Sequence, residues 1–417
     1  MTRMTAMWNI APIATALWRR RSGALLIATQ VALTLAILCN ALVVVLDRQD
    51  QASRPTGVDE ANLFTLQFIT PGYEEDPFGT QRAVEALLRG LPGVREVAWV
   101  NQMPLSSSGS SSGMTSEDGK VTFVNSAHYT AGSSLVQTFG LTLVQGRDFR
   151  PDEFSERDLR QTRLPPTQAL VTRALAEALY PGQAQVVGRA MRWGTGADDP
   201  LITIIGVVDR LVGPWGRADW LAGDRHGERA FITAVRTNER ETFAVRTAPG
   251  QRERVQREAV ARLQAAVPGR ILLGNRSMED LRERRYRSDR WLAGLLLLVT
   301  GLLLVMTAAG IVGLASLWVT QRRRQIGVRR ALGARRVDIV GHFLLENGMI
   351  TSVGVVAGLT LAVALNAALT RVTALPPLQW PVLLGGALLM PLLGVLAVLG
   401  PALRAAHVSP AEATRST

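Results

Sequence analysis

Apolar residues gather in four long stretches that contain no charged residue. The stretches run from Gly23 to Leu46, from Trp291 to Val319, from Asn347 to Thr370 and from Val372 to Leu403. An α-helix needs about 20 predominantly apolar residues to cross the hydrocarbon core of a bilayer, and each stretch meets that length. Charged and polar residues recur throughout the segment between Asp47 and Arg290. The pattern therefore predicts one membrane span, a large polar domain and then three further spans.

The distribution of arginine predicts the orientation of these spans. The segment 320–341 carries seven arginines and one acidic residue, Asp338. Because cytoplasmic loops carry an excess of basic residues, we expect this segment and both termini in the cytoplasm and the large domain outside. A second group, between Arg276 and Arg290, argues the other way, but acidic residues lie among it and long translocated domains have little influence. The first stretch is too long for a signal peptide and is expected to remain as an anchor.

These expectations divide the chain and set its fold class. The parts are a cytoplasmic tail at 1–22, spans at 23–46, 291–319, 342–370 and 380–403, an extracytoplasmic domain at 47–290, a cytoplasmic loop at 320–341, an outer loop at 371–379 and a cytoplasmic tail at 404–417. The predicted fold class is membrane α-helical, with four transmembrane helices, plus an α+β extracytoplasmic domain.

The extracytoplasmic domain contains a partial internal repeat. An apolar run at 62–69 precedes a helical pattern at 80–90, and a similar run at 243–247 precedes a helical pattern at 251–266. A Pro-Gly pair and a strand pattern follow each helical pattern. We therefore predict two strand–helix–strand units, at about 60–130 and 230–280, with an inserted subdomain at about 131–229. Coincidence of a common unit is the alternative interpretation of this repeat.

Three segments between the repeat units have clear local patterns. The β-branched run at 201–208 predicts a buried strand. A short helix is predicted at 172–180, where a Pro-Gly pair ends it. The tract SSSGSSSG at 106–113 lacks apolar residues and predicts a flexible, solvated loop.

No catalytic or cofactor-binding constellation emerges from the residues. A phosphate-binding loop requires G-x-x-x-x-G-K-[ST], whereas Met114 stands at the first glycine position and Val121 follows Lys120. His226 lies between Asp224 and Glu228, and His342 lies four residues before Glu346. Neither set has a third strong ligand, so we predict no metal site.

Charge and cysteine content exclude further classes. The positive charge behind the net charge of +12 comes almost entirely from arginine, and much of that arginine lies beside the predicted spans, so we do not expect nucleic-acid binding. Cys39 lies inside the first span and leaves the outer domain without a disulfide. Ionisable residues are scarce within the spans, which argues against a secondary transporter and favours an external energy source.

The basic segment 321–350 contains the most informative motif. Apolar residues alternate with its arginines, Gly333 is placed to end a short helix, and a second helix is predicted from Arg335 into the third span. The run Arg324, Gln325, Ile326, Gly327, Val328, Arg329, Arg330, Ala331, Leu332, Gly333 and Ala334 resembles the signature of FtsX-like permeases of the macrolide-exporter (MacB) type. FLLE at 343–346, PALRAA…SPAEA at 401–413, GLTLVQGRDF at 140–149 and ALVTRALAEALYPG at 169–182 extend the resemblance over nearly the whole chain.

The resemblance implies a role for this motif. Segment 321–334 is similar to the helix that couples such permeases to their ATPase, and the repeated units would be porter-like. An ABC ATPase in a separate chain would bind ATP and magnesium, leaving this chain non-catalytic and without a cofactor. The permease would act in the bacterial inner membrane with a second copy or a related permease, together with a periplasmic membrane-fusion protein and an outer-membrane channel.

Two departures from the family pattern are visible. Gln325 stands where the family usually has glutamate, so a salt bridge made by that carboxylate is lost, with an effect that the sequence leaves open. The N-terminal ATPase domain of the macrolide exporter is absent from this sequence. Within the family, export of a drug, peptide or other small molecule is the leading hypothesis, and lipoprotein release and control of cell division are the alternatives. A membrane-anchored periplasmic sensor is the alternative from another class.

Small residues in the spans suggest close helix packing. Gly354 and Gly358 form a G-x-x-x-G pattern in the third span. Such a pattern lets helices approach closely in lipid. It is compatible with dimerisation and with packing inside one subunit.

Overall fold

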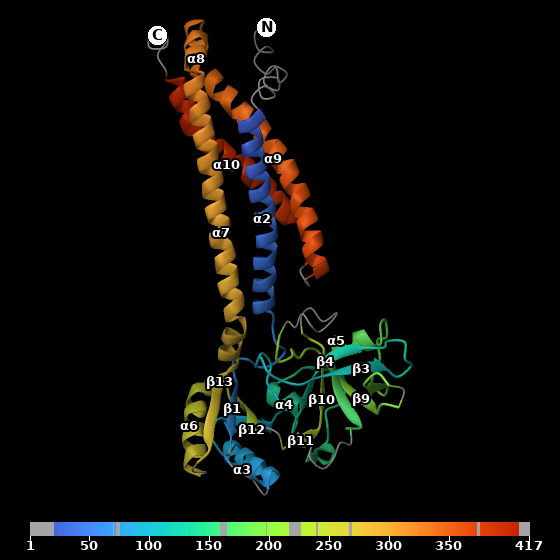
Figure 1. The fold of residues 1–417 in the computed structure, drawn as a ribbon. Helices are drawn as coiled ribbons and strands as arrows, with labels where there is room; N and C mark the ends of the chain where they lie inside the picture. The colour runs from blue at the N-terminus through green and yellow to red at the C-terminus, as the bar shows by residue number, and fades with distance from the viewer. Residues whose placement is uncertain are drawn as a thin grey trace. The chain divides into compact units, whose positions relative to one another are not determined.

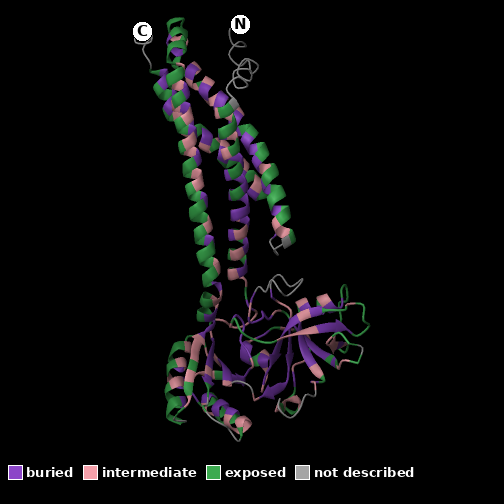
Figure 2. Ribbon diagram, viewed as in Figure 1, coloured by how far each residue is buried: buried purple, intermediate pink, exposed green. Residues whose placement is uncertain are grey.

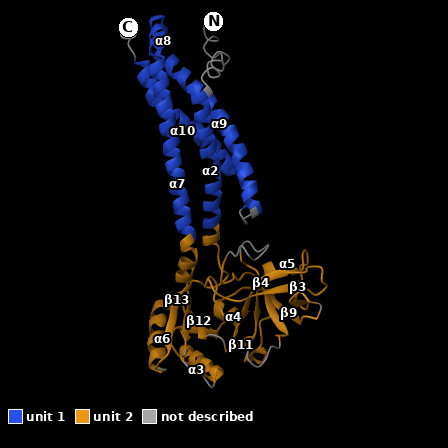
Figure 3. Cartoon of the chain, in the orientation of Figure 1, with its two compact units in different colours: residues 1–49, 289–417 blue, residues 50–288 orange. Residues whose placement is uncertain are grey.

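The computed structural model describes most of the chain. It covers residues 21–69, 71, 76–158, 165–196, 198–216, 227–238, 241–266, 269–372 and 376–407. The chain divides into two compact units, which Figure 3 distinguishes by colour: a helical unit of residues 1–49 and 289–417, and an α+β unit of residues 50–288.

The helical unit consists of long apolar helices and one short helix. The long helices are α2 (Arg21–Ser53), α7 (Met278–Gln321), α9 (Arg336–Val372) and α10 (Trp380–Ala406), and the short one is α8 (Arg323–Ala331) (Figure 1). Among the described residues, four helices are long and apolar enough to cross a membrane. Together with the α+β unit, they confirm the predicted fold class. At 1.5 Å per residue, the 44 residues of α7 extend about 66 Å, well beyond a bilayer core, and α7 begins inside the α+β unit.

Helix α2 forms the centre of the helical unit. It is the most buried of the four long helices, whereas α7 is the most exposed (Figure 2). Polar side chains join α2 to its neighbours: Asn40 donates to the Ala362 carbonyl oxygen at 3.2 Å, and the Thr34 and Thr307 hydroxyls lie 2.9 Å apart. These contacts satisfy polar groups that lipid could not solvate.

The two glycines of the G-x-x-x-G pattern pack within the chain. A Cβ atom on Gly354 would lie 2.8 Å from the Ala28 carbonyl oxygen, and one on Gly358 would lie 2.9 Å from that of Ala32. Both neighbours belong to α2. Glycine therefore permits the close approach of α9 to α2, which is the intramolecular interpretation of the pattern.

The first sheet of the α+β unit contains both strand–helix–strand repeats. Its four antiparallel strands have the order β13-β1-β12-β2, with bounds β1 (Leu63–Ile69), β2 (Val94–Trp99), β12 (Glu241–Thr247) and β13 (Ile271–Ser277). The helices α3 (Pro77–Arg89) and α6 (Arg252–Ala266) share an apolar cluster with this sheet. The predicted element order of the two repeats is confirmed, and the two repeats interleave in one sheet.

The second sheet is mixed and closes through its longest strand. Its order is β5-β9-β7-β10-β4-β3-β8, and β9 also pairs with β8. The bounds are β3 (Ser111–Ser116), β4 (Val124–Thr130), β5 (Leu143–Gly146), β7 (Gln168–Thr172), β8 (Ala190–Trp193), β9 (Leu201–Val208) and β10 (Ala230–Thr233). The predicted strand at 201–208 is confirmed as β9, and the predicted short helix is confirmed as α5 (Arg173–Leu179). Helix α4 (Leu135–Phe139), the 3₁₀ turn η1 (Pro151–Glu153) and the parallel pair β6 (Ser155–Arg157) and β11 (Val235–Thr237) complete the unit.

Two features of this sheet differ from the sequence-based expectation. The serine-rich tract was expected to be a flexible loop, but its end forms β3, in which Ser111 and Ser112 pair with Ala127 and Ser126 of β4. Backbone hydrogen bonds form irrespective of side chain, so a tract without apolar residues can still be a strand. Strands β3 and β4 fall in the range 60–130 assigned to the first repeat, yet they lie in the second sheet.

Candidate functional site

The signature segment folds as a short helix followed by a tight turn. Helix α8 ends at Ala331 with Leu332 as its C-cap, and Gly333 adopts φ +96°, a conformation that glycine tolerates best. The Asp338 carboxylate then accepts the Arg335 backbone N–H at 2.8 Å at the start of α9. The predicted break at Gly333 and the predicted second helix are both confirmed.

The two faces of α8 have opposite environments. Ile326 is 6% exposed and belongs to the apolar core of the helical unit, together with Trp318, Ile339 and Phe343. Val328 is 48% exposed, Leu332 is 83% exposed and Val337, at the start of α9, is 77% exposed. We call Val328, Leu332 and Val337 the docking face. Arg324, Arg329 and Arg335 of the same segment are also exposed, so these three apolar residues belong to a basic surface segment.

A buried ion pair joins the start of this segment to α9. Arg322 precedes α8 and donates from Nη1 to Oε2 of Glu346 at 2.8 Å and from Nη2 to Oε1 at 3.1 Å. The side chains of Arg322 and Glu346 are 14% and 3% exposed. A bidentate arginine–carboxylate pair in a low-dielectric environment has a well-defined geometry. The pair therefore holds the α7–α8 junction against α9.

Glu346 lies where four helices meet. With Asn347 of the same helix, it lines a small cavity whose other walls include Ile27 of α2, Trp318 of α7 and Val398 of α10. Asn347 and Thr351 of α9 face Gly394 of α10. A Cβ atom on Gly394 would lie 2.9 Å from Nδ2 of Asn347 and 3.1 Å from the Thr351 hydroxyl. A line of polar groups therefore continues from Glu346 into the bundle.

The predicted site residues do not all share one surface. Residues 324–334 form α8 and the turn after it, but Ile326 and Gly327 are buried and Gln325 is exposed. Gly354 and Gly358 contact α2 instead. The sequence analysis placed Glu346 beside His342, whereas the structure pairs it with Arg322. His226 and Asp224 lie outside the described residues.

The pairing of Arg322 with Glu346 is not predicted by local sequence patterns, because 24 residues separate the two. One indication was available. Glu346 is the only carboxylate at the inner edge of the third span, and it follows a loop with seven arginines. A carboxylate at a membrane edge requires a partner, so an arginine of the loop was the natural candidate.

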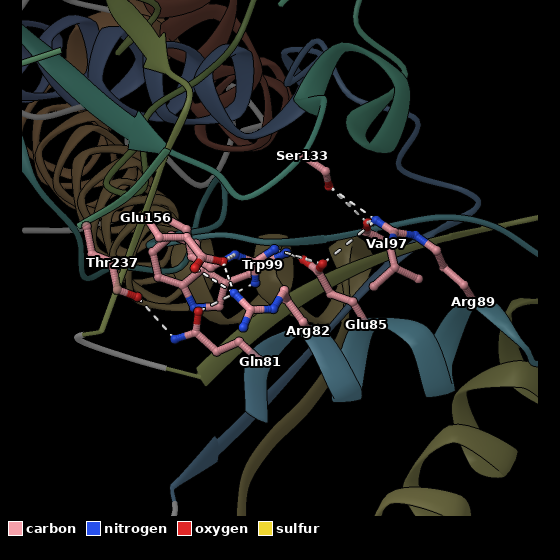
Figure 4. A network of polar contacts seen from close by, with 10 residues as sticks. Gln81, Arg82, Glu85, Arg89, Val97, Trp99, Ser133, Glu156 and Thr237 are labelled. Carbon is pink, nitrogen blue, oxygen red and sulfur yellow. Dashed lines mark hydrogen bonds and ion pairs between the residues drawn. The ribbon is translucent and has the colours of Figure 1, made fainter. Parts of the chain in front are cut away.

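A second buried ion pair lies in the α+β unit. Arg236 of β11 donates from Nη2 to Oε2 of Glu85 in α3 at 2.8 Å, and both side chains are 5% exposed. The other oxygen of Glu85 accepts the Trp99 backbone N–H at 2.6 Å, and Gln81 donates to the Thr237 carbonyl oxygen at 3.1 Å. Figure 4 shows Gln81 and Glu85 on one face of α3, directed at these partners. This network fixes α3 to β11 and to the first sheet.

The edge of this network is more exposed. Arg82 donates to both oxygens of Glu156 at 2.5 Å, with side chains 53% and 37% exposed (Figure 4). Arg89 donates to the Val97 carbonyl oxygen at 2.8 Å, and the Ser133 hydroxyl donates to the same oxygen at 3.1 Å. These contacts surround the buried Arg236–Glu85 pair.

A buried histidine lies in the second sheet. The ring of His128 stacks on Phe231 with centroids 4.4 Å apart, and its Nε2 lies 3.0 Å from the Thr233 hydroxyl. Burial lowers the pKa of His128 to about 3, because the apolar surroundings disfavour the charged ring. The imidazole is therefore neutral at physiological pH and has a structural role.

Comparison with known proteins identifies both units. Residues 297–410 match the family profile of the FtsX-like permease C-terminal region, and residues 26–262 match that of the MacB-like periplasmic core domain. A macrolide export ATP-binding/permease protein MacB from Chromobacterium violaceum is 27% identical over 299 residues, which are 70% of this chain and 43% of that protein. The uncharacterized ABC transporter permease YknZ of Bacillus subtilis is 35% identical over 118 residues, which are 28% of this chain and 30% of that protein.

The chain spans less than half the length of either curated relative. The crystal structure of the periplasmic region of MacB from Actinobacillus actinomycetemcomitans aligns with 57% of this chain and 97% of its own length, at 12% identity and a TM-score of 0.34. Family assignment rests on the two profiles, of which the MacB-like periplasmic core profile alone covers more than half of the chain. The resemblance seen in the sequence is confirmed: this chain is a membrane protein of the FtsX-like ABC transporter permease family and carries a MacB-like periplasmic core domain.

Proposed function

We propose that this chain is the permease subunit of an ABC exporter and transmits ATP-driven motion from a separate ATPase to its periplasmic domain. The docking face is the observation that carries the proposal. Its three exposed apolar side chains lie in α8, just after it and at the start of α9, and exposed apolar side chains of this kind are typical of protein–protein contacts. Family membership implies an ATPase partner, and the partner rather than this chain binds ATP and magnesium.

The charge around the docking face defines the chemistry of the partner. Arginines surround Val328, Leu332 and Val337, so the ATPase presents an apolar pocket bordered by carboxylates. The same arginines support a cytoplasmic location for α8 and both termini, because cytoplasmic loops carry an excess of basic residues. The membrane is then the bacterial inner membrane, with the MacB-like domain in the periplasm.

The proposal includes the protein assembly in which the permease acts and the molecule that it exports. Two permease chains act together, and a membrane-fusion protein and an outer-membrane channel complete the route. Relatives with export in their names, such as the pyoverdine export ATP-binding/permease protein PvdT of Pseudomonas putida, support efflux of a small molecule. A lipoprotein-release or cell-division permease would use the same transmission. Isolation of this chain with a membrane-fusion protein would favour efflux over these alternatives.

The test replaces two residues of the docking face. We expect Val328→Asp with Leu332→Asp to abolish binding of the cognate ABC ATPase, because two carboxylates replace apolar contacts and lower the positive charge of the surface. Binding is measured with the full chain in nanodiscs, and ATP hydrolysis is measured in the same samples. Ile326 is a poor target because an acidic residue at that buried position would disturb the fold itself.

The matched control introduces two aspartates at exposed apolar positions elsewhere. Leu201 and Ile271 are 46% and 52% exposed and lie in the α+β unit. Leu201→Asp with Ile271→Asp should leave ATPase binding intact. Equal binding by the docking-face variant and the wild type would reject the proposed coupling role, and absence of any ATPase binding would favour a sensor.

A further inference from the structure

Segment 322–337 is attached to the membrane helices by three kinds of contact. Ile326 packs into the apolar core. Arg336 Nη1 lies 3.4 Å from Nε2 of His407 in an exposed position. The Arg322–Glu346 pair provides two charge-assisted hydrogen bonds between buried groups.

These contacts differ in how they resist displacement. Apolar contacts are non-directional, so the packing of Ile326 does not by itself set the direction in which α8 moves. The exposed Arg336–His407 contact is weakened by water and salt. Separation of the buried ion pair leaves two charges without partners in a poorly solvated environment, which is strongly unfavourable. Arg322 and Glu346 therefore move together.

The surroundings of Glu346 allow its motion to reach other helices. The carboxylate borders the small cavity between α2, α7, α9 and α10, which leaves space beside it. Asn347 and Thr351 continue the polar line along α9 and face Gly394 of α10. A displacement of Glu346 is thus opposed by fewer packed atoms than one at a fully packed position.

We infer that Arg322 and Glu346 are the positioning residues through which displacement of α8 is transferred to α9. This inference rests on the proposed function. The docking face receives the ATPase, and the ion pair converts movement of α8 into movement of α9. Arg322 and Glu346 do not contact the ATPase in this scheme. Their loss should therefore separate ATPase binding from the motion that follows ATP hydrolysis.

The central variant is Arg322→Gln with Glu346→Gln. It leaves no unpaired buried charge, so the chain should fold, but it replaces two charge-assisted hydrogen bonds by a weaker amide contact. Spin labels at Trp291→Cys and Arg371→Cys, in a Cys39→Ala background, report the distance between α7 and the far end of α9. The full chain in nanodiscs is studied with the cognate ABC ATPase, with and without ATP.

The expected result is a separation of two readouts. ATPase binding remains at the wild-type level, whereas the ATP-dependent change in label distance falls about fivefold. The reversed pair, Arg322→Glu with Glu346→Arg, should restore most of the change. A merely structural role of the pair would lower thermal stability without altering the ATP response of the folded fraction.

Two results would overturn the inference. One is a wild-type ATP response in the double glutamine variant, and the other is loss of ATPase binding together with the response. Failure of the proposed function looks different, because the wild-type chain itself would then show no ATPase binding and no ATP-dependent change. Arg404→Gln, at an exposed position near the end of α10 and outside the docking face, serves as the control for altered charge in the helical unit.

Discussion

The helical unit and the α+β unit each contain a buried arginine–glutamate pair, but the two pairs are built differently. In the α+β unit, Glu85 divides its oxygens between Arg236 and the Trp99 backbone, and Gln81 lies beside the pair. In the helical unit, both oxygens of Glu346 accept from Arg322 alone. The first carboxylate joins three elements, whereas the second joins two.

The comparison shows that the other partners of the glutamate decide whether an arginine–glutamate pair is fixed or can move. A carboxylate that several directional hydrogen bonds hold in place cannot move without breaking some of them. Its role is therefore to maintain the structure of its domain. A carboxylate with one bidentate partner beside a cavity can move with that partner. The Arg236–Glu85 pair is therefore a structural clamp, and the Arg322–Glu346 pair is suited to transmit displacement.

The largest effect is expected from breaking the clamp. Glu85→Ala leaves Arg236 buried without its main partner and the Trp99 N–H without an acceptor, which should lower the free energy of unfolding by about 3–5 kcal/mol. Thermal and denaturant unfolding of the full chain in detergent measures the loss. Arg82→Ala is the control, because its partly exposed pair should change stability little. Equal losses in both variants would show that burial does not distinguish the two pairs.

A somewhat smaller effect is expected in the helical unit. Arg322→Gln leaves Glu346 buried without a cation and should cost about 3 kcal/mol. Adding Glu346→Gln should recover most of that stability, because the unpaired charge is removed. Unfolding in detergent of the single and double variants tests this. A double variant less stable than the single one would contradict the expected coupling.

The smallest effect concerns acid sensitivity of the α+β unit. The pKa of His128 is about 3 in the folded chain because of burial, against about 6.5 for an unperturbed histidine. The unfolded chain therefore binds the proton more readily than the folded chain does. The contribution of neutral His128 to the free energy of unfolding is fully present above pH 6.5 and is lost as the pH falls toward 3. At pH 5 the loss is about 2 kcal/mol.

His128→Phe provides the control for this prediction. Phenylalanine keeps an aromatic ring against Phe231 but has no titratable group. The difference in unfolding free energy between wild type and His128→Phe should shift by about 2 kcal/mol between pH 7.5 and pH 5. A difference that is independent of pH would show that His128 does not titrate on unfolding.

Local patterns predicted local structure well. Four apolar stretches became long helices, and both strand–helix–strand repeats, the strand at 201–208 and the break at Gly333 appear where the sequence indicated them. The serine-rich tract was an exception, because strand pairing uses backbone groups and Ser111–Ser116 found partners in β4 and β8. Local composition does not reveal such a partner.

The sequence indicates which segment forms the candidate site, but not which residues attach that segment to the membrane helices. The motif 324–334 indicated a partner contact, and the structure divides that motif into a buried side with Ile326 and an exposed side with Val328 and Leu332. The coupling role of the motif stays a prediction. Its attachment through Arg322 was not visible, because residues outside the motif make the contact.

The amino-acid sequence by itself determined the membrane spans, the separate α+β domain and the basic segment, because hydropathy, helical periodicity and charge act over a few turns of chain. Only the tertiary structure decided that Gly354 and Gly358 contact α2, that β3 and β4 join the second sheet, and that Arg322 pairs with Glu346. Each of these contacts joins residues far apart in the chain, and each is selected by close packing or by the need of a buried polar group for a partner. Many residues of the chain could satisfy each requirement, and only the folded structure decides which of them occupies the position.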